Sequence, residues 1–202
     1  MIAIIDYGMG NIHSVKKALE VMGARTLVTN KPQEIRKCEK IVLPGVGAFG
    51  DAMEELKKQD LIAAIKDDIR GKKIFLGICL GMQLLFESSE ESPGVKGLGV
   101  LKGEVKKFPY RQGLKVPHMG WNQLKKVAGK CPLLKDVEDN AFVYFCHSYY
   151  PAPQETDVPA AITDYGEDFT SMVWKDNVYG AQFHPEKSQT VGLDILRNFV
   201  KL

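Results

Sequence analysis

The first 80 residues alternate short apolar runs with segments whose apolar positions recur at helical spacing. Ile12, Val15, Leu19 and Met22 follow the first such run, as the inner face of a helix does. This alternation predicts a parallel sheet covered by helices on both faces, with ligands bound beyond the carboxyl ends of the strands. The predicted strands are Ile2–Asp6, Arg25–Thr29, Lys40–Leu43 and Ile74–Ile78, and the predicted helices after the first are Pro32–Cys38 and one capped by Asp51 that runs through Leu56.

From Leu98 the pattern changes to shorter apolar segments separated by turn residues. These segments predict an antiparallel meander appended to the parallel sheet. They are Val100–Leu101, Val105–Phe108, Val116, Phe142–Cys146, Ala160–Thr163 and Ser171–Trp174, with turns at Gly103, Gly113, Gly120, Gly129 and Pro151. A last strand, Val178–Phe183, precedes a helix from Val191 to Leu202. The expected fold class is α/β, a mostly parallel central sheet flanked by helices with an appended antiparallel β meander, in a single domain spanning residues 1–202.

Composition narrows the class of protein. The 202 residues carry a net charge of +2 without a basic block, so neither nucleic acid nor an anionic membrane surface is an expected partner. No apolar run approaches the roughly 20 residues that span a bilayer. The cysteines, at positions 38, 79, 131 and 146, lie far apart and form no Cys-x-x-Cys pair. Together with an N-terminus unlike a signal peptide, this spacing predicts a cytoplasmic protein without a zinc site or disulfide framework.

The stretch Gly77-Ile78-Cys79-Leu80-Gly81-Met82-Gln83 is the strongest chemical signal. Gly-x-Cys-x-Gly between a predicted strand and the predicted helix that contains residues 82–86 has the spacing of a nucleophile elbow, with cysteine in place of serine. Glycines permit a sharp turn, and free N–H groups at a helix start favour the thiolate form. The alternative interpretation is a small buried cysteine in an ordinary turn.

A candidate base follows the last strand, in His184-Pro185-Glu186. The carboxylate two residues beyond the imidazole can hold His184 in one tautomer, which is the orienting role of the third member of a catalytic triad. A single histidine is more often structural, but its combination with the elbow favours a catalytic pair.

Three further segments are open to a functional or a structural interpretation. Pro44–Ala52 is rich in glycine at a strand end and can supply backbone N–H groups to an oxyanion, or it can be a connecting loop. Pro117–Asn122, predicted as a turn, and the aromatic strand Phe142–Tyr150 can be core with a polar rim. The glycine-bearing turn after Asp6 lacks a phosphate-binding motif and is interpreted as a plain tight turn.

The elbow and the His-Pro-Glu segment together resemble the class I (triad) glutamine amidotransferases, whose fold is flavodoxin-like. The resemblance puts Cys79, His184 and Glu186 in the three catalytic positions, and Gln83 completes the Gly-x-Cys-x-Gly-x-Gln form. It implies hydrolysis of glutamine through a cysteinyl thioester, without a cofactor or metal. It implies an oxyanion held by the backbone of Leu80 and of Gly45, Val46 or Gly47, and substrate contacts from Gln83, Glu91, Ser148 and Tyr149.

Within that family, Asp6–Asn11, Pro44–Phe49, Pro117–Asn122 and His147–Tyr149 resemble the branch that delivers ammonia to a (β/α)₈-barrel cyclase in histidine biosynthesis. The resemblance implies a heterodimer whose interface on this chain includes Asn11, Met119, Trp121, Tyr144 and Lys187. One alternative keeps the triad but changes the partner, as in the amidotransferase component of anthranilate or aminodeoxychorismate synthase. The other alternative is a catalytically silent flavodoxin-like binding module.

Overall fold

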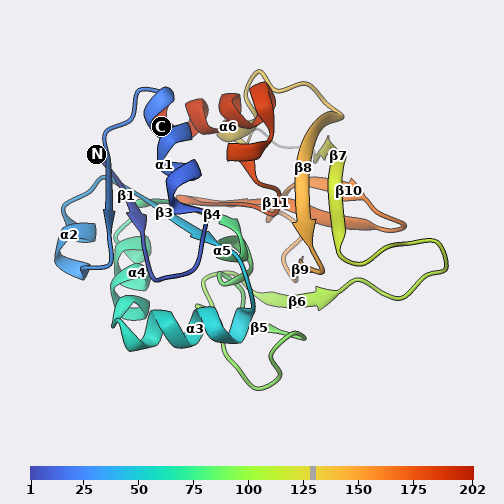
Figure 1. Cartoon of the computed structure of the whole chain (residues 1–202), viewed down its shortest axis with the longest axis horizontal. Helices are drawn as coiled ribbons and strands as arrows, with labels where there is room; N and C mark the ends of the chain where they lie inside the picture. Colours follow the sequence, from blue (N-terminus) through green and yellow to red (C-terminus); the bar gives the residue numbers. More distant parts are fainter. Residues whose placement is uncertain (128–130) are drawn as a thin grey trace.

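A computed structural model describes residues 1–127 and 131–202, so the turn expected at Gly129 lies outside the described residues. A sheet of nine strands, in the order β2-β1-β3-β4-β12-β11-β10-β7-β8, runs through the molecule (Figure 1). Its first five strands are parallel to one another and the others are antiparallel. The predicted fold class is therefore confirmed: most of the antiparallel strands continue the parallel sheet, and β6 and β9 pair in a smaller second sheet.

The parallel strands are buried on both faces. In β1, Ile2 and Ile4 face one core cluster while Ala3 and Ile5 face the other, which explains a continuous apolar run in place of an alternating one. The parallel strands are β1 (Ile2–Ile5), β2 (Thr26–Thr29), β3 (Lys40–Gly45), β4 (Ile74–Cys79) and β12 (Val178–Ala181).

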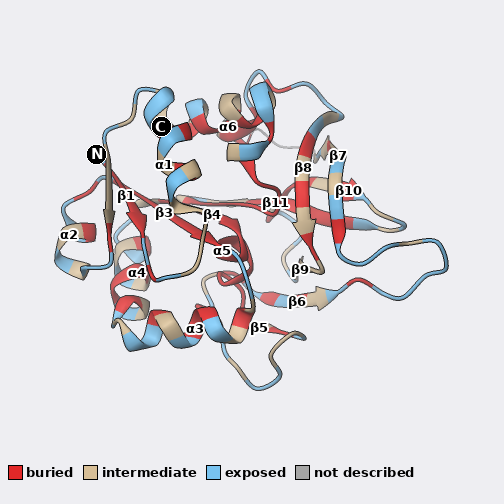
Figure 2. Ribbon diagram, viewed as in Figure 1, coloured by how far each residue is buried: buried red, intermediate tan, exposed pale blue. Residues whose placement is uncertain are grey.

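Two groups of helices cover this half of the sheet (Figures 1 and 2). Helices α1 (Ile12–Val21) and α6 (Gln189–Lys201) pack on one face. Helices α2 (Pro32–Arg36), α3 (Phe49–Lys58) and α4 (Leu61–Arg70) lie on the other. Their buried side chains face the sheet while the outer faces are exposed (Figure 2). Helix α4 is not among the elements predicted from the sequence.

The antiparallel half brings distant segments next to the parallel strands. It contains β7 (His118–Lys126), β8 (Ala141–His147), β10 (Pro159–Asp164) and β11 (Asp168–Lys175). A smaller sheet, in the order β5-β6-β9, consists of Ser88–Ser89, Gly103–Lys107 and Tyr149–Pro153. Short helical turns are α5 (Leu80–Gln83), η1 (Pro132–Leu134) and η2 (Pro185–Lys187). Within the described ranges, no helix is both long and apolar enough to cross a membrane.

Several local predictions are wrong. Pro117–Asn122 is not a turn, because from His118 onward it pairs with β8. Pro151 lies inside strand β9, and no strand forms at Val100–Leu101.

Two helix predictions are also wrong in their limits. Helix α5 ends at Gln83, before Leu84–Phe86. Helix α3 begins at Phe49 and is not capped by Asp51. Its first N–H groups instead donate to side chains 42 residues away, from Phe49 N to Glu91 Oε2 (2.7 Å) and from Gly50 N to Ser92 Oγ (2.9 Å). Such distant acceptors cannot be identified from local sequence.

Candidate active site

Three adjacent strand ends deliver the candidate residues to one edge of the sheet. Strand β4 lies between β3 and β12, with Gly45 beside Cys79 and Ala181 beside Ile78. The glycine-rich segment after β3, the thiol at the end of β4 and the His184 segment after β12 therefore emerge together. This is the edge at which parallel sheets bind ligands.

The turn at Cys79 is sharp and strained. Cys79 adopts φ 54° and ψ −110°, a conformation that non-glycine residues rarely adopt and that is typical of nucleophile elbows. The flanking glycines permit it, because a Cβ on Gly77 would lie 2.4 Å from the Gly81 carbonyl oxygen and one on Gly81 would lie 1.8 Å from that of Leu43. The two glycines of the Gly-x-Cys-x-Gly motif are therefore required because the backbone leaves no room for a side chain at either position.

We expect Gly81→Ala to destabilise the fold by about 3 kcal/mol or more, because the added methyl group meets backbone that cannot move aside. Thermal and denaturant unfolding measure the effect. Gly71→Ala is the matched control, since its Cβ would lie 3.3 Å or more from its neighbours and its φ of −70° suits alanine. Equal midpoints for the two variants would contradict the close approach at Gly81.

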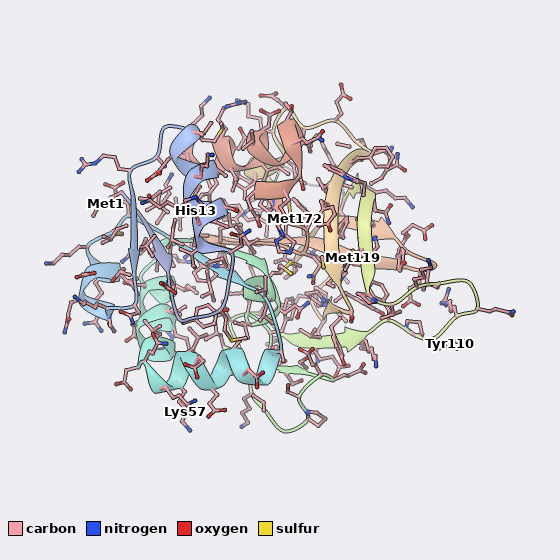
Figure 3. All side chains as sticks on the ribbon, in the orientation of Figure 1. Met1, His13, Lys57, Tyr110, Met119 and Met172 are labelled. Atoms are coloured by element: carbon pink, nitrogen blue, oxygen red, sulfur yellow. The ribbon has the colours of Figure 1, made fainter. Side chains whose placement is uncertain are left out.

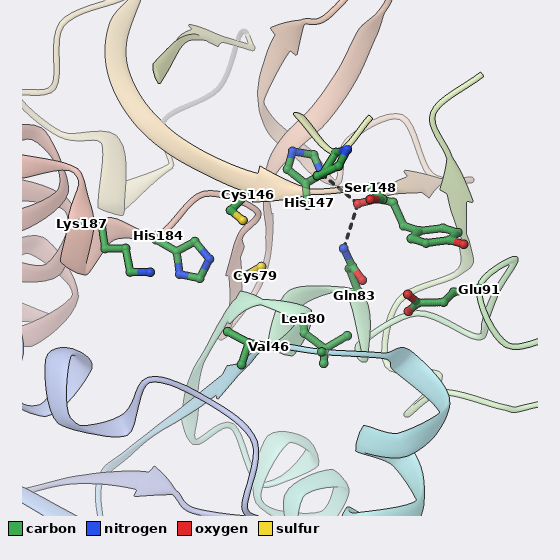
Figure 4. A pocket seen from close by; sticks show the side chains of 13 residues that line it. Val46, Cys79, Leu80, Gln83, Glu91, Cys146, His147, Ser148, His184 and Lys187 are labelled. Atoms are coloured by element: carbon green, nitrogen blue, oxygen red, sulfur yellow. Dashed lines mark hydrogen bonds between the residues drawn. The ribbon is translucent and has the colours of Figure 1, made fainter. Parts of the chain in front are cut away.

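His184 and Glu186 form a buried pair beside the thiol. His184 Nδ1–H donates to Glu186 Oε1 at 2.9 Å, and the two side chains are 5% and 1% exposed. Burial opposes protonation of the imidazole, but hydrogen bonds and Coulomb attraction from Cys79 and Glu186 outweigh it and raise the pKa of His184 to about 10. With Nδ1 engaged by the carboxylate, Nε2 is the ring nitrogen left for the thiol. Figure 4 shows the ring on the same side of the pocket as the sulfur.

Gln182 is a site residue that the sequence analysis did not identify. Its Nε2 donates to Cys79 Sγ at 3.7 Å, and its Oε1 accepts from Gln83 Nε2 at 3.1 Å. The side chain is fully buried. A glutamine within the otherwise apolar run Val178–Phe183 was the available signal, because buried polar groups require partners.

A cavity of about 320 Å³ opens over Cys79, at the small end of the range for small-molecule sites (Figure 4). It brings together the thiol, His184 and every residue for which the resemblance implied a substrate contact. The lining residues are Val46, Gly47, Cys79, Leu80, Gln83, Glu91, Pro117, Cys146, His147, Ser148, Tyr149, His184 and Lys187. Pro117, Cys146 and His147 were not among the predicted site residues.

The expected oxyanion donors surround the thiol. Val46 and Gly47 line the cavity, while Gly45 lies beneath it, close to Leu80. Leu80 begins helix α5, so its N–H has no acceptor within the helix. Glu91 enters from the opposite wall, where its carboxylate accepts from Phe49 N.

Among the expected interface residues, Lys187 lines the cavity, and Met119 pairs with Cys146, another lining residue, in the β7–β8 ladder. Met119 and Trp121, on β7, are 61% and 46% exposed. The Trp121 ring contacts Tyr144 on β8, at 6.0 Å between centroids, and the Lys187 ammonium lies 6.0 Å from the Tyr144 ring centroid. Asn11 instead caps helix α1, accepting from Ser14 N at 3.3 Å, and α1 contacts the η2 turn that contains Lys187. Figure 3 labels Met119 in the antiparallel half of the molecule, to which β7 belongs.

The residues that the structure describes contain no cluster of three or more His, Cys, Asp or Glu side chains suited to a metal ion.

Comparison with known proteins defines the class to which the fold and site belong. Residues 3–202 match the family Glutamine amidotransferase class-I, and the chain belongs to this family. A crystal structure of a glutamine amidotransferase superposes with a TM-score of 0.78 at 17% identity, covering 100% of this chain and 98% of that one. PurLQS from Thermotoga maritima superposes at 0.71 with 21% identity, covering 98% and 94% of the two chains. At these identities the two structures show the fold alone.

The finer placement comes from closer relatives. Imidazole glycerol phosphate synthase subunit HisH from Geobacter metallireducens is 51% identical, over 98% of this chain and 96% of that protein. The subunit of the same description from Methanocaldococcus jannaschii is 50% identical over the full length of both chains. Within the class, the chain is a glutamine amidotransferase subunit of the imidazole glycerol phosphate synthase type. These relatives favour the histidine branch over the anthranilate and aminodeoxychorismate alternative.

Proposed function

We propose that the chain hydrolyses glutamine with Cys79 as the nucleophile, His184 as the acid and base, and Glu186 as the residue that orients His184. The observation that carries this proposal is the buried His184–Glu186 pair, whose imidazole shares one cavity with a thiol on a strained elbow. An imidazolium beside the sulfur stabilises the thiolate, which is the attacking form.

The proposed reaction has two steps. The Cys79 sulfur attacks the side-chain amide carbon of glutamine, and His184 gives a proton to the departing nitrogen, which leaves as ammonia. A γ-glutamyl thioester remains on Cys79. His184 then takes a proton from water, the hydroxide attacks the thioester, and the carbon–sulfur bond breaks to release glutamate and restore the thiolate.

The far wall of the cavity suits the amino-acid end of glutamine. Glu91 supplies a carboxylate for the α-ammonium group, while Gln83, Ser148 and Tyr149 supply further polar groups around the amino-acid end of the substrate. The cavity of about 320 Å³ has room for an amino acid of this size. Glutamine bound between this wall and the elbow presents its amide carbon to the sulfur.

We propose that the ammonia passes to a (β/α)₈-barrel cyclase that binds over the cavity mouth. The exposed Met119 and Trp121, together with Tyr144, Lys187 and Asn11, are its proposed docking residues. A partner bound over the opening of the cavity would keep the ammonia out of bulk water, where at neutral pH it becomes protonated and no longer acts as a nucleophile. The four cysteines are free thiols, which supports a cytoplasmic location, and the family match supports one amidotransferase domain over residues 1–202.

We expect the glutaminase to be weak in the isolated chain and to rise about 10²–10³-fold when the cyclase and its ribotide ligand are present. The proposed cause lies in the Gly45–Gly47 segment, where the Val46 peptide has to turn its N–H toward the oxyanion. Loss of one oxyanion donor typically lowers the rate by about 10²–10³-fold. Val46 is 42% exposed at the cavity, so a docked partner can reach it.

Glutamate release by the chain alone, with the cyclase, and with cyclase plus ribotide measures this dependence. Full activity of the isolated chain would rule out the switch while leaving the triad in place. Absence of activity in the complete mixture would contradict the proposed function itself.

A further inference from the structure

A chain of hydrogen bonds leads from strand β7 into the glutamine cavity. Two buried histidines form its centre, with His118 Nδ1 lying 3.1 Å from His147 Nε2. At one end, Asn122 Nδ2 lies 3.3 Å from His118 Nε2. At the other end, His147 Nδ1 lies 2.9 Å from the Tyr149 carbonyl oxygen. The two imidazoles are 3% and 6% exposed, so water does not compete for these contacts.

The direction of donation along this chain is fixed by its last contact. A carbonyl oxygen only accepts, so His147 Nδ1 carries the hydrogen. Burial lowers the pKa of His147 to about 3, and the ring is therefore neutral and its Nε2 is an acceptor. His118 Nδ1 must then donate, and because burial lowers the pKa of His118 to about 4, its Nε2 accepts from Asn122. The Asn122 amide is itself oriented, since its Oδ1 accepts from Gln123 N and its Nδ2 donates to the Asp164 carbonyl.

This series of hydrogen bonds ends at the carbonyl oxygen of Tyr149, a residue that lines the cavity. The Tyr149 carbonyl also accepts from Gln83 Nε2 at 2.8 Å, and the same nitrogen of Gln83 donates to Gln182, which donates to Cys79 Sγ. The dashed contacts in Figure 4 show Gln83 and His147 converging on the Ser148–Tyr149 segment. His147 thus holds the Tyr149 carbonyl group, which is also hydrogen-bonded to Gln83 and, through Gln83 and Gln182, connected to the Cys79 sulfur.

We propose that His118 is a positioning residue for the glutamine site: by donating from Nδ1 it holds His147 in the tautomer that fixes the Tyr149 carbonyl, and with it the Ser148–Tyr149 wall. This inference rests on the proposed function, because it concerns how that wall binds glutamine. His118 does not touch the cavity, so its effect passes through His147. The same strand presents Met119 and Trp121 outward, so one strand joins the proposed docking face to the cavity wall.

Three variants separate this role from packing. His118→Leu removes both ring nitrogens, whereas His118→Asn keeps an amide N–H close to the place of Nδ1. Phe169→Leu is the packing control, because the Phe169 ring contacts His118 and His147 at centroid distances of 5.8 and 5.2 Å without hydrogen bonding to either. Each variant is assayed in complex with the cyclase and ribotide. Its thermal unfolding is also recorded, so that His118→Leu and Phe169→Leu can be compared at a similar loss of stability.

We expect His118→Leu to raise the KM for glutamine about tenfold with kcat within about threefold, the size of effect seen when a buried polar group loses its partner. His118→Asn and Phe169→Leu should stay within about threefold of wild type in KM. Labelling of Cys79 by the glutamine analogue diazo-oxo-norleucine should slow about tenfold in His118→Leu, while alkylation by iodoacetamide, which does not use the wall, stays unchanged.

If His118→Leu kept the wild-type KM and labelling rate, this inference would be wrong while the proposed function would stand. The same conclusion would follow if Phe169→Leu raised the KM as much as His118→Leu, or if His118→Asn did not restore a KM close to that of wild type. A wild-type chain that reacts with iodoacetamide but not with the glutamine analogue in the full complex would instead overturn the proposed function.

Discussion

Replacing Cys79 with alanine should lower glutamine hydrolysis by about 10⁴-fold or more. The thiolate is the only group on the elbow that can form the γ-glutamyl intermediate, and removal of a covalent nucleophile typically leaves the small catalysis that binding and oxyanion stabilisation provide. Steady-state glutamate release, measured in the presence of the proposed cyclase partner and its ribotide, gives the size of the loss. The thioester on the wild-type chain, trapped by acid and identified by mass at Cys79, is the complementary measurement.

The matched control separates chemistry from assembly. In the Cys79→Ala complex, ammonium salt at pH 8.5–9 supplies free ammonia directly to the partner. Cyclisation with ammonia should then proceed close to the wild-type rate while cyclisation with glutamine is lost. Loss of both reactions would show that the substitution disturbs the complex, and retention of both would show that another residue attacks glutamine.

The parallel half of the fold was predictable because its signals are local. Each buried strand is a short apolar run, and each run is followed by helical spacing or a glycine turn, as at Ile2–Asp6 and Ile12–Met22. Helix α4 has the same kind of spacing, with Leu61, Ala64, Ile65 and Ile69 buried, so its apolar pattern also indicates a helix.

Other features depend on contacts that local sequence does not specify. Pro117–Asn122 contains proline and glycine and therefore suggests a turn, but pairing with β8 draws it into a strand, with Gly120 at φ +137°. The start of α3 is set by Glu91 and Ser92, which come from beyond the next strand. In both places tertiary partners override the local preference.

The candidate site divides in the same way. Cys79, His184 and Glu186 stand in short motifs whose spacing reflects backbone constraints, so they could be named from the sequence alone. Gln182 and His118 act through hydrogen bonds across 103 and 29 residues, to Cys79 and His147 respectively. The sequence does not reveal these two hydrogen-bonded pairs, because glutamine and histidine occur as readily at exposed positions as at buried ones that require a partner.

Replacing Glu186 with glutamine should lower kcat by about 10²–10³-fold at pH 8 and move the alkaline limb of its pH profile to lower pH. The amide still offers an oxygen to His184 Nδ1–H, so the ring keeps its orientation, but the negative charge is lost. Hydrogen bonds and charge from Cys79 and Glu186, acting against burial, raise the pKa of His184 to about 10. Without the carboxylate this pKa falls toward its ordinary value of 6.5.

The sign of the pH effect follows from the step proposed for His184. The departing nitrogen needs a proton from the imidazolium, so activity is lost as pH rises through the pKa of His184. Wild type should therefore keep its kcat to about pH 10, whereas Glu186→Gln should lose it at least one pH unit earlier. Asp194→Asn, which removes a partly exposed carboxylate paired with Arg197 on α6, is the charge control and should leave the profile unchanged. An unshifted alkaline limb in Glu186→Gln would mean that the buried carboxylate does not sustain the protonated imidazole, and the acid would have to be sought elsewhere in the cavity.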